Sequence, residues 1–250
     1  GRGASGTGAQ AYGQIGGGGS LHNSAMSGTT TVTASGDVIL TGGDSSNRSA
    51  RIGLGGVGIG DTAVNADLTD AATSVTATNV TMTGGIGASA FTQIGAGGGA
   101  SGGDNPFVGT IAGATTVAAT GSITMGSGGN SGVFGSFSQI GIGGRGADAA
   151  TMNGDTTVTF GNGLTLDASS GGLNSYVQIG AGGDDADGVI TSNTAVTGTG
   201  DIVLTAGAAT SGSYAQIGSG GTDADGGDIT GNVLVGGDSL TLNGGAGTGG

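Results

Sequence analysis

The chain lacks many of the residues on which common folds and active sites depend. Its 250 residues include no Cys, no Trp, no Lys and no Glu, and only one Pro (Pro106) and one His (His22). Glu and Lys are good helix formers, so their absence argues against an α-helical protein. The absence of Cys gives no information on the redox compartment in which the protein works. The chain is rich instead in Asp, Asn, Ser, Thr and Gly, which favour turns and strands.

Charge and hydropathy exclude two classes of partner. All 17 acidic residues are Asp, all four basic residues are Arg, and the net charge is −13. A chain this acidic repels phosphate backbones, so we expect no nucleic-acid partner, whereas cations are natural ones. No stretch reaches the roughly 18 apolar residues of a membrane helix, so we expect no transmembrane segment.

Catalysis has little chemical support in this composition. The single His22 lies in a stretch rich in Gly and Ser, and Cys, Lys and Glu are missing. The Asp residues gather in clusters that recur along the chain, whereas an active site is a single constellation of groups. We therefore expect that the protein is not an enzyme.

Glycine accounts for 65 residues, yet 34% of the chain is hydrophobic and the Val, Ile and Leu residues are regularly placed, which argues against disorder. One eight-residue word recurs at 12–19, 49–56, 91–98, 137–144, 176–183 and 214–221, from "YGQIGGGG" to "YAQIGSGG". Its isoleucines are separated by 37, 42, 46, 39 and 38 residues. Internal repeats at such a period are typical of solenoids and propellers. We predict one repeat domain over 1–250, with six repeats of about 40 residues.

A second pattern lies between the copies of the word. Apolar residues recur in steps of six, six and two, as at Ile190, Val196, Ile202 and Leu204. In the second and last repeats, Ser74 and Leu234 take the central position. Steps of six and two share the parity of a strand, whose side chains alternate between two faces. Glycine between the second and third positions of the pattern predicts short strands separated by corners.

These patterns predict an all-β fold, a parallel β-solenoid in which each strand stacks on its equivalent in the next rung. A propeller is less suitable, because its blades need four longer antiparallel strands. The six-residue step suggests rungs of roughly 20 residues and so two rungs per repeat, and one large rung per repeat is the alternative.

Alternation within the word assigns its residues to two faces. We expect the invariant isoleucine to point inward and two ladders to point outward. The aromatic ladder is Tyr12, Phe91, Phe137, Tyr176 and Tyr214, and the amide ladder is Gln14, Gln93, Gln139, Gln178 and Gln216. Stacked Gln amides can bond to one another along the axis. The ladders either only stabilise the stacking or form a contact stripe for another filament or for sugar rings.

Two loops rich in Asp are the candidate ligand site. "GGDDADG" (182–188) and "GGTDADGGD" (220–228) occupy equivalent places in neighbouring repeats and supply Asp184, Asp185, Asp187, Asp223, Asp225 and Asp228. Closely spaced Asp on glycine turns can supply the oxygen ligands that Ca²⁺ needs. Stacking predicts that Asp185 lies near Asp223, and Asp187 near Asp225. The alternative is that these residues are solvated turns with no cofactor.

Threonine triplets suggest one more surface. Thr31-Val32-Thr33, Thr81-Met82-Thr83 and Thr157-Val158-Thr159 flank apolar residues that we expect to point inward, so their hydroxyls would point outward. Regular threonine arrays on flat solenoids organise water in some ice-binding proteins, and threonine is also simply a good strand former.

The stretches "GDIVLTAG" (200–207) and "SYAQIGSGG" (213–221), which recur through most of the chain, resemble the repeats of filamentous-haemagglutinin-like proteins and related long bacterial adhesins. The resemblance implies a right-handed parallel β-helix, secretion to the extracellular space or cell surface, and roles in adhesion, biofilm or filament formation. The step from Leu204 to Tyr214, applied to Leu242, puts the next aromatic at about residue 252. We therefore expect a segment of a longer solenoid.

The function we expect is structural: an extracellular β-solenoid that builds a fibre, filament or stalk through contacts with copies of itself. The alternatives are an adhesin that binds surface glycans and a calcium-stabilised or ice-binding repeat.

Overall fold

The computed structural model describes residues 11–20, 25–59, 64–65, 67–101, 107–129, 135–146, 151–170, 172–207, 212–223 and 227–245. The described residues form thirty β-strands and no helix, and each strand has two to five residues. The all-β prediction is therefore confirmed.

The strands form five main sheets, named here by their composition, and one two-stranded sheet. The aromatic sheet holds β1 (Tyr12–Ile15), β6 (Ser49–Ile52), β12 (Phe91–Ile94), β18 (Phe137–Ile140), β23 (Tyr176–Ile179) and β27 (Tyr214–Ile217). The glycine sheet holds β2 (Gly18–Ser20), β7 (Gly55–Ile59), β13 (Gly97–Ser101) and β19 (Gly143–Arg145). The two-stranded sheet pairs β8 (Val64–Asn65) with β14 (Phe107–Val108).

The other three sheets have six strands each. The short-strand sheet holds β3 (Met26–Ser27), β9 (Leu68–Thr69), β15 (Thr110–Ala112), β20 (Thr151–Asn153), β24 (Ile190–Thr191) and β28 (Ile229–Thr230). The valine sheet holds β4 (Thr30–Thr33), β10 (Thr73–Ala77), β16 (Thr115–Ala119), β21 (Thr156–Phe160), β25 (Thr194–Gly198) and β29 (Val233–Gly236). The leucine sheet holds β5 (Val38–Thr41), β11 (Val80–Thr83), β17 (Ser122–Gly126), β22 (Gly163–Asp167), β26 (Asp201–Thr205) and β30 (Ser239–Asn243).

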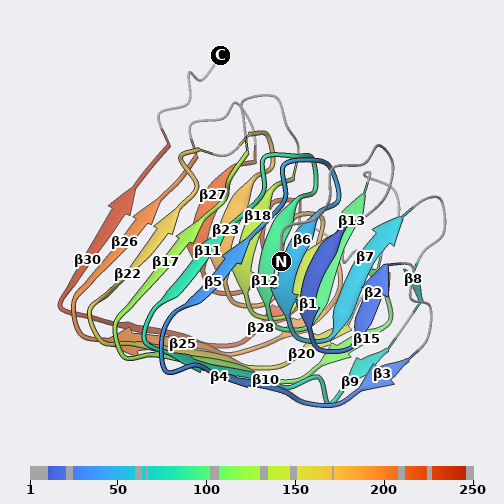
Figure 1. Ribbon diagram of the computed structural model, residues 1–250, viewed down its shortest axis with the longest axis horizontal. Coiled ribbons are helices and arrows are strands. Elements are labelled where there is room, and N and C mark those ends of the chain that lie inside the picture. The colour runs from blue at the N-terminus through green and yellow to red at the C-terminus, as the bar shows by residue number, and fades with distance from the viewer. Residues whose placement is uncertain are drawn as a thin grey trace.

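In the four six-stranded sheets, each strand pairs in parallel with its equivalent in the neighbouring repeat. Each repeat therefore contributes one strand to each of these sheets, and its strands together are called a coil. Tyr176 pairs with Tyr214, Val158 with Val196, and Leu166 with Leu204. In Figure 1 the equivalent strands therefore lie side by side in chain order, from blue β5 to red β30 in the leucine sheet. This arrangement is consistent with a β-solenoid. The prediction of two rungs per repeat is wrong, because the six-residue step crosses a corner between the valine and leucine sheets of one coil.

The valine sheet also corrects the alignment of two repeats. Val75 pairs with Val117, and Val235 pairs with Val196, so the central column is valine in all six coils. Ser74 and Leu234, which the spacing placed there, are neighbours of the true column residues. In the second coil Asp70 adopts a positive φ of 51° in a turn one residue longer than that of the next coil, which shifts the spacing.

The apolar side chains form three clusters of buried residues. The largest joins the isoleucines of the aromatic sheet to the inward residues of the valine and leucine sheets, among them Ile140, Val158 and Leu166. A second joins the short-strand sheet to the residue two positions after each isoleucine, such as Ile142. The third is a stack of aromatic rings on the other face of the aromatic sheet. Both faces of this sheet are therefore covered, as is common in parallel sheets.

One column of polar residues lies on the same face of the valine sheet as the buried valines. Thr73, Thr115, Thr156 and Thr194 pair in register and are at most 2% exposed. Within the described structure their hydroxyls have no hydrogen-bond partner. In the last coil Val233 takes the same column.

Candidate functional site

The aromatic ladder lies inside the protein, and the prediction that it points outward is wrong for Phe91, Phe137 and Tyr176, each 0% exposed. Their rings stack with centroids 4.6 and 4.7 Å apart, and the half-buried Tyr214 continues the stack at 5.1 Å. Only Tyr12, in the first coil, is exposed, at 46%. The rings from Phe91 to Tyr214 therefore form an internal column and offer no stripe to a sugar or a second filament.

The glycine cluster of each word explains the burial of the rings. After the corner the chain turns back, and the glycine sheet covers the face of the aromatic sheet that carries the rings. A Cβ added to Gly99 would lie 2.9 Å from Cε1 of Phe91, and one added to Gly183 would lie 2.7 Å from the Tyr176 hydroxyl. Because glycine has no side chain, its backbone packs directly on the ring edges.

The amide ladder is internal as well, which corrects the second outward prediction. Gln93, Gln139 and Gln178 are 0% exposed, while Gln14 and Gln216, in the terminal coils, are half-buried. Each amide group donates to carbonyl oxygens instead of reaching solvent. Nε2 of Gln139 lies 3.4 Å from the carbonyl oxygen of Ile142 and 3.0 Å from that of Gly182 in the next coil. A direct bond between amides joins Gln93 to Gln139, at 3.2 Å. The ladder therefore ties neighbouring coils together through the backbone.

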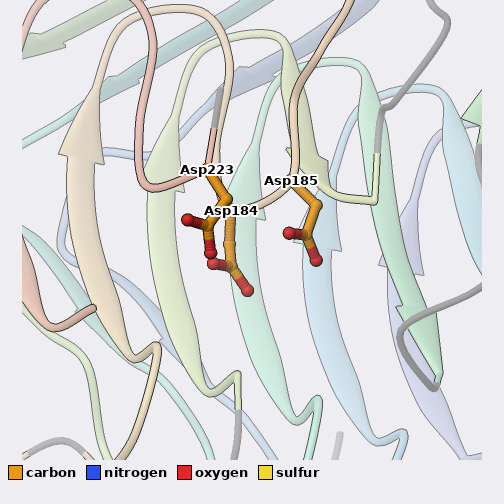
Figure 2. Close-up of side chains that lie close together, drawn as sticks. All are labelled: Asp184, Asp185 and Asp223. Atoms are coloured by element: carbon orange, nitrogen blue, oxygen red, sulfur yellow. The ribbon is translucent and has the colours of Figure 1, made fainter. Parts of the chain in front are cut away.

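Three of the predicted metal ligands come together in the loops after β23 and β27. Carboxylate oxygens of Asp184, Asp185 and Asp223 all lie within 4.8 Å of one another. Figure 2 shows Asp184 and Asp223 side by side with Asp185 beyond them. The predicted proximity of Asp185 and Asp223 is confirmed. Asp187 and Asp228 are not members of this group, and Asp225 lies outside the described residues, as does His22.

Asp184 is the buried member of this acidic cluster. It is 0% exposed, and Nε of Arg145 donates to its Oδ2 at 3.1 Å, while Oδ1 has no hydrogen-bond partner in the part of the chain that the structure describes. Loss of hydration and then the charge of Asp185 raise the pKa of Asp184 to about 6, although Arg145 acts to lower it. Burial likewise raises the pKa of Asp185. The Arg145 ion pair thus offsets only part of the cost of burying the Asp184 carboxylate.

Sequence reasoning missed the ion pair, although the repeat contains the signal. Arg145 and Asp184 each stand five residues after the isoleucine of their word, and Thr222 holds that place in the next coil. Stacking in register therefore puts the arginine beside the aspartate. The hydroxyls of Tyr176 and Tyr214 lie close enough to interact with Asp184, and their pKa values are raised well above 10, mainly by burial.

The acidic cluster can offer oxygen ligands to a hard cation, which is the chemistry that Ca²⁺ and Mg²⁺ prefer. Three carboxylates supply part of a calcium shell, and Arg145 competes for one of them. The described residues contain no helix that is long and apolar enough to span a membrane. No protein-family model, no curated protein and no solved structure matches this chain.

Proposed function

We propose that the protein is a structural, extracellular β-solenoid that builds a fibre or stalk by stacking one coil on the next. The supporting observation is that equivalent residues pair in the same register through six coils in four sheets. Every coil contributes an isoleucine and a valine to the same columns, and five of the six coils also contribute an aromatic ring and an amide, so length grows by repeating the same contacts. The proposal includes closed, right-handed coils, secretion and a relationship to the long bacterial adhesins, as the repeat resemblance implies.

Burial along the stack shows what a neighbouring coil contributes. In the valine sheet Val196 is 0% exposed, whereas its paired residue in the last described coil, Val235, is half-buried. Leu204 is 8% exposed and its partner Leu242 is 67% exposed. A coil covered on one side only therefore leaves apolar side chains in water, at a free-energy cost of about 25 cal/mol per Å² of exposed apolar surface. A further coil, or another copy of the chain, would cover them.

The purified protein is imaged by negative-stain electron microscopy across a concentration series. The comparison is the double variant Leu240→Asp/Leu242→Asp. We expect filaments whose width is that of one coil, and shorter or no filaments for the double variant. An insertion that duplicates one coil lengthens the object by about 4.8 Å in small-angle scattering. Compact monomers at every concentration, together with no lengthening on coil insertion, contradict the proposal.

A second candidate is calcium stabilisation, which the proximity of Asp184, Asp185 and Asp223 favours. Ca²⁺ would relieve the repulsion among these carboxylates, so it should raise the unfolding midpoint of the protein but not that of Asp185→Asn/Asp223→Asn. Titration calorimetry that shows no heat with Ca²⁺ and an unchanged midpoint removes this candidate.

The threonine alternative also keeps a specific observation in its favour. Thr31 and Thr33 on β4, and Thr157 and Thr159 on β21, are exposed on the outer face of the valine sheet. Ice binding predicts thermal hysteresis that Thr157→Lys abolishes. The glycan-binding alternative loses the exposed aromatic stripe on which it rested.

A further inference from the structure

The second coil holds a buried positive charge that no described carboxylate neutralises. Arg51 stands in the amide column where the other coils have glutamine, and it is 2% exposed. Its Nη2 donates to the carbonyl oxygens of Leu54 at 2.7 Å and Gly97 at 2.8 Å. Within the described structure, Nε and Nη1 have no hydrogen-bond partner. Unpaired buried charges are costly, so this guanidinium calls for a counter-charge.

A second unpartnered donor lies on the same face of the same strand. Ser49 takes the place of the aromatic ring, is 4% exposed, and its Oγ has no hydrogen-bond partner among the described residues. Side chains two residues apart on a strand share a face, so Ser49 and Arg51 leave β6 on the same side. Ser49 pairs with Tyr12, and the ring stack begins at Phe91 in the following coil. The serine therefore stands between these two rings, where the column has no ring of its own.

The guanidinium turns its unpartnered edge toward this position. A Cβ added to Gly98 would lie 3.2 Å from Nη1 of Arg51, whereas one added to Gly55 would lie 2.9 Å from Nη2. Gly183 holds the place of Gly98 in the fifth coil, and a Cβ added to it would lie 2.7 Å from the Tyr176 hydroxyl. Nη1 thus lies on the side of the aromatic column, and Nη2 on the side of the carbonyls that it binds.

We propose that Arg51 and Ser49 hold a monatomic anion, chloride in ordinary solution, inside the second coil. Water could accept from the free N–H groups, but it would leave the charge uncompensated, whereas an anion does both. A monatomic ion suits a position whose side chains are almost fully enclosed. Burial lowers the pKa of Arg51 to about 9, so the side chain is still charged at neutral pH. This inference goes beyond the structural role and is independent of the calcium candidate.

The test uses bromide, which replaces chloride and scatters anomalously. The folding equilibrium constant is measured by urea unfolding in sodium bromide against sodium methanesulfonate at the same ionic strength. A bromide concentration ten times the dissociation constant raises it about elevenfold. Arg51→Gln restores the residue of the other coils and should remove the dependence. Arg145→Gln removes an arginine that already faces a carboxylate and should leave the dependence unchanged.

Diffraction from a bromide-soaked crystal supplies the second readout. The proposal expects an anomalous peak between Ser49 Oγ and Nη1 of Arg51, absent in Arg51→Gln. The proposal is overturned if Arg51→Gln keeps the bromide dependence of the parent protein, or if the crystal shows only water at this position.

Discussion

The two faces of the aromatic sheet are both buried, yet they are held by different forces. On one face Ile94, Ile140 and Ile179 pack into the largest apolar cluster. On the other face a column of stacked rings and a column of amides are covered by glycine backbone. The first face needs only size and hydrophobicity, whereas the second also needs hydrogen bonds and the absence of side chains on its cover. The comparison shows that two kinds of core can share one four-residue strand.

Truncating a side chain on the apolar face should cause the largest loss of stability. Ile140→Ala leaves a cavity in the middle of the stack, so we expect it to lower the free energy of unfolding by about 3–4 kcal/mol, measured by urea denaturation. The matched control is Ile39→Ala, on the outer face of the leucine sheet at 68% exposure, which should change it by less than about 0.5 kcal/mol. Equal losses for the two variants would contradict the assignment of inner and outer faces.

On the polar side of the sheet, the stability of the protein should depend on pH through Asp184. Because its pKa is raised from 3.8 to about 6, the folded protein holds a proton that the unfolded chain releases between these values. Stability should therefore fall as pH rises from about 4 to about 6, by up to about 3 kcal/mol. Asp184→Asn should flatten this part of the profile. An unchanged slope in that variant would assign the pH dependence to other groups.

The amide column should be more costly to lose in the middle than at the end. Gln139→Leu keeps the volume but removes the donor to Ile142, Gly180 and Gly182, so we expect a loss of about 2 kcal/mol. Gln216→Leu, where the half-buried amide makes one bond at 3.0 Å to Ser219, should cost about 0.5–1 kcal/mol. If the two losses are the same, the bonds between coils contribute nothing.

The smallest expected effect is a gain in stability. Thr115 places an unpartnered hydroxyl on the apolar side of the sheet, within the region that the structure describes. Thr115→Val copies Val233 of the same column and should stabilise the protein by about 1 kcal/mol. The exposed Thr116→Val is the control and should have little effect. A loss of stability at Thr115 would reveal a partner for the hydroxyl, such as an ordered water.

Much of the fold could be predicted from the sequence, because repetition fixes register. Aligning the isoleucines of the word already pairs Ile140 with Ile179, and the parity of the steps assigns both to one face. The prediction failed on the other face, because alternation says that Phe137 and Gln139 oppose the isoleucine but does not say what covers them. The cover is a run of glycines, which has the composition of a loop and carries no apolar signal of its own.

Only part of the acidic cluster could be predicted from the sequence, for a similar reason. Equivalent loops put Asp185 beside Asp223 by register alone, and the structure confirms that they are close. The pairing of Asp184 with Arg145 follows from their equal distance after the isoleucine, but the burial of Asp184 depends on the path of the glycine sheet, which spacing does not specify. The error at Ser74 and Leu234 came from one-residue changes in turn length, which shift a spacing without changing the column.

Parallel pairing makes the stack of coils directional. Every coil presents one side to the coil before it and a different side to the coil after it, so the two sides of a coil are complementary surfaces and not copies of one another. Contacts of this kind join head to tail and cannot close into a two-fold dimer. Copies that stack through their coils would therefore all point the same way, and the assembly would have distinguishable ends with no geometric stop.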